Sequence, residues 1–149
     1  MIQLIRTNSN NKDFVTLVKK LDQFLAVSDG EDHAFYDQFN KLDTIKHVIV
    51  AYLDDKPVGC GAIKQYDGFT VEVKRMFTTI EARGKGIASL ILAELEKWAI
   101  ELSYKRAVLE TGIRQVEAIG LYKKNDYKVI ENYGQYTGVK DSVCFEKLL

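Results

Sequence analysis

The sequence contains few of the side chains that bind metal ions. Its only cysteines are Cys60 and Cys144, and its only histidines are His33 and His47. Both cysteines lie in apolar or strand-like surroundings, and the four residues do not have the spacing of a metal site. We therefore expect no metal cofactor, and thiols that stay reduced.

The sequence also lacks an excess of charge of one sign and a long apolar segment. Lys plus Arg and Asp plus Glu number 21 each, so no overall field attracts nucleic acid or an anionic membrane. No apolar run approaches the ~18 residues of a membrane-spanning helix, and residues 1–4 do not resemble a signal peptide. We expect a cytoplasmic protein without nucleic-acid or membrane partners, in which any anion site is local.

Length and composition predict a single domain over residues 1–149. Hydrophobic residues make up 46% of the chain and charged residues 28%, which is ordinary for a globular protein. A chain of this length can bury a substantial core. We find no internal repeat and no linker that would divide it.

Hydrophobic periodicity predicts a mixed α/β fold. Alternating or continuous apolar residues predict strands at 2–6, 46–53, 58–64, 70–77, 105–110, 127–130 and 142–148. Helical spacing predicts helices at 13–27, 31–42, 87–102 and 115–124. Because short turns join the strands between residues 46 and 77, we expect an antiparallel meander there, followed by alternating helices and strands.

In the strand at 70–77, alternation predicts which residues share a face. We expect Val71, Val73 and Phe77 on one side of the strand. The other side would carry Glu72, Lys74 and Met76, and Arg75 interrupts the apolar side.

A loop with two glycines joins this strand to the long helix at 87–102. Its sequence is Arg83-Gly84-Lys85-Gly86-Ile87-Ala88. The first turn of a helix has backbone N–H groups without partners and a partial positive charge. Glycines let an anion approach the backbone, and the Arg and Lys side chains add positive charge. The loop is therefore either a phosphate site or a basic surface turn, and it matches neither the Walker A nor the Rossmann pattern.

The loop resembles a signature of the GNAT acetyltransferase superfamily. Arg83-x-x-Gly86-x-Ala88 is similar to its [Q/R]-x-x-G-x-[G/A] motif, and the resemblance extends over residues 50–130. It implies a GNAT-like fold, a mostly antiparallel sheet of six or seven strands with about four helices, and acetyl-CoA as cosubstrate. In that family the loop 83–88 would hold the pyrophosphate. The backbone of Met76, Phe77 and Thr78 would bind the pantetheine arm, and Gln115 stands where many members have a CoA-contacting asparagine.

Two residues are candidates for the chemistry of acetyl transfer. Tyr122 lies in a segment that resembles the family's A-I-x-L-Y-x-K motif, which implies a general acid for the leaving CoA sulfur; alternatively, its ring only packs the helix on the sheet. Glu72 resembles the general base of one branch of the family, which would take a proton from an amine. The alternative for Glu72 is a surface ion pair. The resemblance also implies a turn after Lys124, in which Asn125 replaces a glycine and would tolerate a left-handed backbone.

The acceptor would be an amine of a small molecule, an amino acid or a peptide. Four residues are candidates for contact with it: His33, Tyr36, Tyr133 and Tyr136. The alternatives are a solvated helix face for the first two and an ordinary hairpin loop for the tyrosines at 133 and 136. A homodimer is compatible with the resemblance. A non-catalytic acyl-CoA-binding module remains the alternative function, since it would need the loop but not Tyr122.

Overall fold

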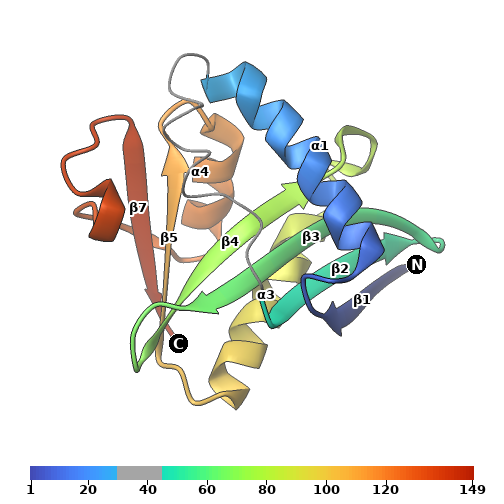
Figure 1. Cartoon of the computed structure of the whole chain (residues 1–149), viewed down its shortest axis with the longest axis horizontal. Coiled ribbons are helices and arrows are strands. Elements are labelled where there is room, and N and C mark those ends of the chain that lie inside the picture. The colour runs from blue at the N-terminus through green and yellow to red at the C-terminus, as the bar shows by residue number, and fades with distance from the viewer. Residues whose placement is uncertain (30–44) are drawn as a thin grey trace.

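One seven-stranded sheet forms the centre of the protein (Figure 1). The structure is a computed structural model that describes residues 1–29 and 45–149. The strands are β1 (Ile2–Thr7), β2 (His47–Leu53), β3 (Lys56–Gln65), β4 (Thr70–Thr78), β5 (Arg106–Gly112), β6 (Lys128–Ile130) and β7 (Ser142–Leu148). Their order is β1-β2-β3-β4-β5-β7-β6, and only β4 and β5 pair in parallel. The predicted mixed, mostly antiparallel sheet is confirmed.

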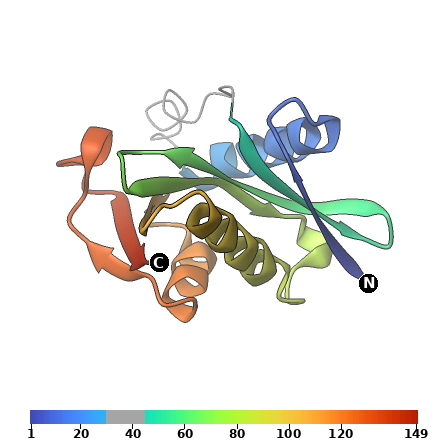
Figure 2. The same ribbon diagram turned by 90° about the horizontal axis from the view of Figure 1, so that it is seen from below.

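Helices cover both faces of this sheet. Figure 2 shows α1 (Lys12–Asp29) on one face, with α3 (Ile87–Glu101) and α4 (Val116–Lys124) on the other. Two short 3-10 turns, η2 (Ile80–Ala82) and η3 (Gly134–Tyr136), complete the described elements. The helix predicted at 31–42 lies outside the described residues. All three helices predicted within residues 1–29 and 45–149 are present.

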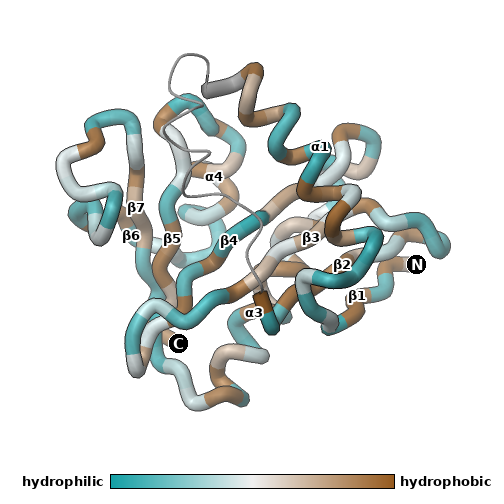
Figure 3. The backbone as a smooth tube through the Cα atoms, viewed as in Figure 1, coloured by the Kyte–Doolittle hydropathy of each residue, from teal (hydrophilic) through white to brown (hydrophobic). Residues whose placement is uncertain are grey.

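The helix α1 packs its apolar stripe on the sheet. Asn11 caps the helix, because its Oδ1 accepts a hydrogen bond from the Phe14 backbone N–H at 3.0 Å. Figure 3 shows hydrophobic and hydrophilic residues alternating along α1. Phe14 and Leu17 are buried with Val48 and Val50 of β2, as the helical spacing predicts.

The helix α3 approaches the opposite face closely, because β3 has a glycine beneath it. A Cβ atom at Gly61 would lie 2.9 Å from Ile91 Cγ2 and 3.0 Å from Leu95 Cδ1. A larger residue at position 61 would therefore force the side chains packed on it to shift. Ile87, Ile91 and Leu95 are all buried in this second core.

A β-bulge in β4 overturns part of the predicted alternation. Val71 and Val73 pack in the α3-side core as expected, but Met76 packs there too, and Phe77 packs against the α1-side core. The cause is Arg75, whose φ of 60° adds a residue opposite β3, where the register shifts between Cys60 and Ala62. One extra residue inverts the sides of every residue after it.

The strands β4 and β5 separate beyond a short parallel contact, as Figure 1 shows. Their pairing runs from Thr70↔Arg106 only to Glu72↔Val108. Past that point, no strand among the described residues pairs with β4 on its β5 side. The N-terminus of α3 and one side of α4 flank the gap, so the topology places backbone groups and two helices around it.

The turn after α4 also differs from the prediction by one residue. Asn125 has a φ of −98°, and Asp126 has the left-handed backbone, with a φ of 72°. The Asn125 side chain instead donates hydrogen bonds to Ser89 Oγ at 3.1 Å and to the Leu121 carbonyl at 2.9 Å. Asn125 therefore ties α4 to the first turn of α3.

Candidate active site

A cleft of about 430 Å³ occupies the gap between β4 and β5. It is lined by β4, the loop before α3, the end of β5, α4, and three side chains of α1. Most of the predicted site residues line it: Glu72, Met76, Phe77, Thr78, Arg83, Gly84, Gly86, Ile87, Ala88, Gln115, Tyr122 and Tyr136. Predicted site residues that lie as far apart in the sequence as Glu72 and Tyr136 thus line one cleft.

One end of the cleft is a cradle of backbone N–H groups. Gly84 and Gly86 have φ values of 79° and 77°, and a Cβ atom at either would meet nothing within 4 Å. Gly86 caps α3 without a side-chain hydrogen bond. In the described part of the chain, the N–H groups of residues 87–89 have no acceptor. These donors and the helix dipole suit an anion such as a phosphate.

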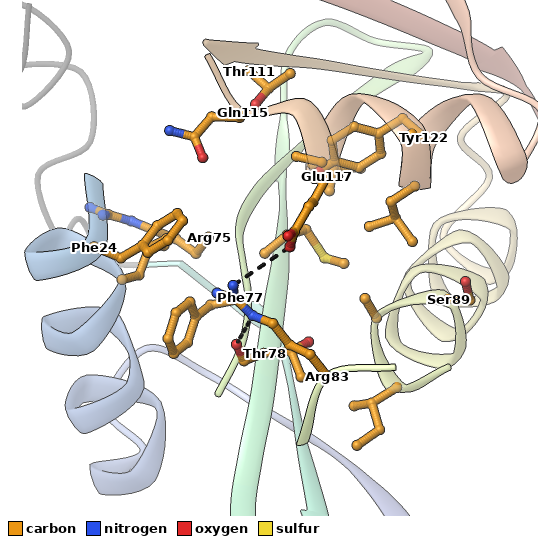
Figure 4. A pocket seen from close by; sticks show the side chains of 18 of the residues that line it. Phe24, Arg75, Phe77, Thr78, Arg83, Ser89, Thr111, Gln115, Glu117 and Tyr122 are labelled. Atoms are coloured by element: carbon orange, nitrogen blue, oxygen red, sulfur yellow. Dashed lines mark hydrogen bonds and ion pairs between the residues drawn. The ribbon is translucent and has the colours of Figure 1, made fainter. Parts of the chain in front are cut away.

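Arg83 is fixed beside this cradle. Its Nε donates to the Thr78 carbonyl at 3.1 Å, and its guanidinium lies over the Phe24 ring, 5.0 Å from the centroid. Its Nη1 is also 3.6 Å from Glu117 Oε2 of α4 (Figure 4). Lys85 is exposed and does not line the cleft, so its contribution to an anion site stays a prediction.

The free half of β4 provides polar groups along the floor of the cleft. Met76, Phe77 and Thr78 line it, where β4 has no pairing with β5. The Thr78 hydroxyl oxygen is buried and has no hydrogen-bond partner among the described residues. A buried hydroxyl without a partner is costly, which fits a ligand that runs along this strand.

Tyr122 enters the cleft from α4. Figure 4 shows its ring on the α4 side, with Arg83 at the opposite end. The side chain is buried, with its ring centroid 5.8 Å from those of Tyr127 and Phe145. Burial, together with the charge of Glu110, raises the pKa of Tyr122 well above its usual value. The phenol therefore keeps its proton and can act as a hydrogen-bond donor or acid.

Glu72 lies deeper in the cleft, at the last pairing of β4 with β5. It is 8% exposed, so the surface position of the alternative interpretation is wrong, although an ion pair with Lys74 is present. Its Oε2 accepts a hydrogen bond from the Tyr133 hydroxyl at 2.6 Å, and its Oε1 is 3.8 Å from Lys74 Nζ. A carboxylate held in this way can accept a proton from a bound group.

Of the remaining predicted residues, some line the cleft, one lies beside it, and two lie outside the described residues. Gln115 precedes α4, and Tyr136 belongs to η3; both are buried and line the cleft. Tyr133 does not line it and contacts it through Glu72. His33 and Tyr36 lie outside the described residues.

Sequence reasoning missed several polar residues of the cleft. Ser89, Glu110, Thr111 and Glu117 all line it. Glu110 accepts a hydrogen bond from Ser142 Oγ at 2.8 Å. A signal was available for Glu110 and Thr111, because the carboxyl end of a parallel strand commonly borders a ligand site.

The described residues contain neither a candidate membrane-spanning helix nor a candidate metal cluster. No helix in residues 1–29 or 45–149 is long and apolar enough to cross a membrane. The same residues contain no group of three His, Cys, Asp or Glu side chains that could hold a metal ion.

Comparison with known proteins agrees with the fold. The profile of the acetyltransferase (GNAT) family matches residues 15–127. An IAA acetyltransferase of Azospirillum brasilense is 32% identical over 137 residues, which cover 91% of this chain and 90% of that protein.

Two solved structures have the same architecture. A Klebsiella pneumoniae protein provisionally assigned as an acyl-CoA N-acyltransferase has a TM-score of 0.83 at 26% identity, covering 100% of this chain and 98% of its own. The PaiA N-acetyltransferase of Thermoplasma acidophilum, solved in complex with coenzyme A, has a TM-score of 0.74 at 17% identity, covering 100% and 99%. The profile match and the Azospirillum relative show that this chain belongs to the acetyltransferase (GNAT) family.

Proposed function

We propose that this protein transfers the acetyl group of acetyl-CoA to the amine of a small molecule, an amino acid or a peptide. The amine would attack directly, in a complex that contains both substrates. One observation carries the proposal: a single cleft contains an anion cradle at one end, and a protonated phenol and a buried carboxylate along its length. The coenzyme A in the Thermoplasma structure supports the choice of cosubstrate.

The residues of the cleft fit acetyl-CoA in their order along it. The N–H groups of residues 87–89 would hold the diphosphate, with Gly84 and Gly86 leaving room for it and Arg83 adding charge. The free side of β4 at residues 76–78 would bind the pantetheine arm, and Gln115, just before α4, would contact it. Acetyl-CoA supplies an activated thioester, and protein groups would bind it and transfer the protons.

The proton transfers follow from two side chains. An amine is protonated at neutral pH, so Glu72 would take one proton before the nitrogen attacks the thioester carbon. As the C–S bond breaks, Tyr122 would donate its proton to the leaving sulfur, which departs as the CoA thiol. The second proton, which the nitrogen loses as the amide forms, would return to the Tyr122 phenolate, and Glu72 would release its proton to solvent. The raised pKa of Tyr122 would keep its hydroxyl protonated until the C–S bond breaks.

Calorimetric titration with acetyl-CoA tests the proposal, with NAD as the control. We expect saturable binding of acetyl-CoA alone. Thiol release from acetyl-CoA is then measured with putrescine, tyramine, glycine and glycylglycine as acceptors. Binding without thiol release for any amine would favour a non-catalytic acyl-CoA-binding module, and no binding would refute the anion cradle.

A further inference from the structure

A tyrosine from the C-terminal loop makes a short hydrogen bond to Glu72. Tyr133 directly precedes η3, and its hydroxyl donates to Glu72 Oε2 at 2.6 Å. The two residues are 61 positions apart in the sequence. This length is typical of a charge-assisted O–H···O⁻ bond, which is about twice as strong as a neutral one.

Packing fixes the Tyr133 ring before the hydroxyl makes this bond. The Tyr66 ring meets it edge-on, 5.2 Å between centroids, and the Tyr136 ring meets it at 5.8 Å. The next residue is Gly134, with a φ of 52°, and a Cβ atom there would lie 3.5 Å from the Tyr66 hydroxyl. Two rings and a tight turn therefore set the direction of the Tyr133 hydroxyl.

The bond acts on one oxygen of the carboxylate only. Oε2 is occupied by Tyr133, whereas Oε1 is the oxygen near Lys74, at 3.8 Å. Glu72 lines the cleft and Tyr133 does not. Burial and the negative charge of Glu72 raise the pKa of Tyr133 far above its usual value, so Tyr133 remains a donor.

We propose that Tyr133 is a positioning residue that holds the Glu72 carboxylate in the orientation needed to take a proton from the acceptor amine. It acts through Glu72 and touches neither substrate. The inference rests on the proposed function, in which Glu72 is the general base.

A matched pair of variants separates this role from ordinary packing. Tyr133→Phe keeps the ring and removes the hydroxyl. Tyr52→Phe removes a bond of the same kind and length, from the Tyr52 hydroxyl to Asp13 Oδ2 at 2.6 Å, between β2 and α1 and outside the cleft. With the best acceptor of the four amines, we expect kcat to fall about tenfold in Tyr133→Phe, part of the ~10²–10⁴-fold that a general base contributes. KM for acetyl-CoA should not change, and Tyr52→Phe should lower the melting temperature while leaving kcat unchanged.

A double-mutant cycle with Glu72→Gln completes the test. If Tyr133 acts through Glu72, adding Tyr133→Phe to Glu72→Gln should lower kcat by less than twofold. An equal loss in both backgrounds would overturn the inference, as would an unchanged kcat in Glu72→Gln. Failure of the wild-type protein to acetylate any of the amines would instead contradict the proposed function itself, and the inference with it.

Discussion

At the scale of single residues, the hydroxyl of Tyr122 is the most direct test of the chemistry. Its ring packs on Tyr127 and Phe145, so Tyr122→Phe should preserve the fold and the binding of acetyl-CoA. Turnover should fall at least several-fold, because the leaving sulfur loses its acid. Thiol release measured beside calorimetric binding checks both parts.

The control for Tyr122→Phe is Tyr127→Phe in the same aromatic cluster. The Tyr127 hydroxyl donates to Glu96 Oε2 at 3.0 Å, so this variant should lose stability without losing turnover per folded molecule. If Tyr122→Phe turns over at the wild-type rate, Tyr122 only packs α4 on the sheet.

If acetyl-CoA binds at the anion cradle, Glu117 should compete with it for Arg83. Their ion pair of 3.6 Å joins α4 to the loop beside the anion cradle, and the Glu117 side chain is 87% exposed. Exposed pairs contribute little, so Glu117→Gln should tighten acetyl-CoA binding by no more than a few-fold, most clearly at low salt. Calorimetric titrations at two salt concentrations measure this, and weaker binding in the variant would show that Glu117 assists the ligand.

At the scale of residues, the sequence predicts residues of the cleft where a motif surrounds them. Tyr122 and Gly86 are found in this way and line the cleft. The contact between Tyr133 and Glu72 could not be predicted, because the two residues are 61 positions apart in the sequence. They come together only because the sheet places β4, β5 and β7 next to one another. The one-residue error at Asn125 has a local cause: both Asn and Asp tolerate a left-handed backbone, so composition does not decide between neighbours.

At the scale of elements, the N-terminus of α3 provides a sharp test of the anion cradle. Gly86→Asp places a negative charge where the diphosphate should lie, and the side chain has open space around it. We expect acetyl-CoA binding to fall below detection with the fold intact, as circular dichroism would show.

A matched substitution exists in the loop before β7. Gly138 has a φ of 80°, close to that of Gly86, and a Cβ atom there would also meet nothing within 4 Å. It does not line the cleft. Gly138→Asp therefore imposes the same backbone strain and charge and should bind acetyl-CoA normally; equal losses in the two variants would assign the effect to strain.

The bulge in β4 shows what periodicity can and cannot reveal about an element. The bounds of β4 were predicted to within one residue, Thr70–Thr78 against 70–77. The exchange of faces by Met76 and Phe77 was not predicted, because the extra residue at Arg75 is visible only in the pairing with β3. Arg75 did interrupt the apolar side, and that interruption was the available signal.

At the scale of the whole molecule, a short turn predicts that the two strands it joins pair in the sheet, whereas a long connection predicts no pairing. The meander of β2, β3 and β4 follows from turns of a few residues. The insertion of β7 between β5 and β6 has no local signal, and neither does the early end of the β4–β5 pairing that opens the cleft. The position of the cleft was predictable from the resemblance, since the loop and α4 carry the family's motifs and line it.

The cleft lies between the two parts of the sheet, so a ligand in it should stabilise the whole molecule. It contacts β4 and the α3 loop on one side and β5 and α4 on the other. A ligand that binds only the folded state, at a hundred times its Kd, adds about 2.7 kcal/mol to the free energy of unfolding. For a chain of this size we expect acetyl-CoA to raise the melting temperature by roughly 5–10 °C. Thermal unfolding with acetyl-CoA, with NAD and without ligand measures the shift.

NAD should leave the melting temperature unchanged, and so should acetyl-CoA in Gly86→Asp. A full shift in that variant would mean that the diphosphate binds away from α3.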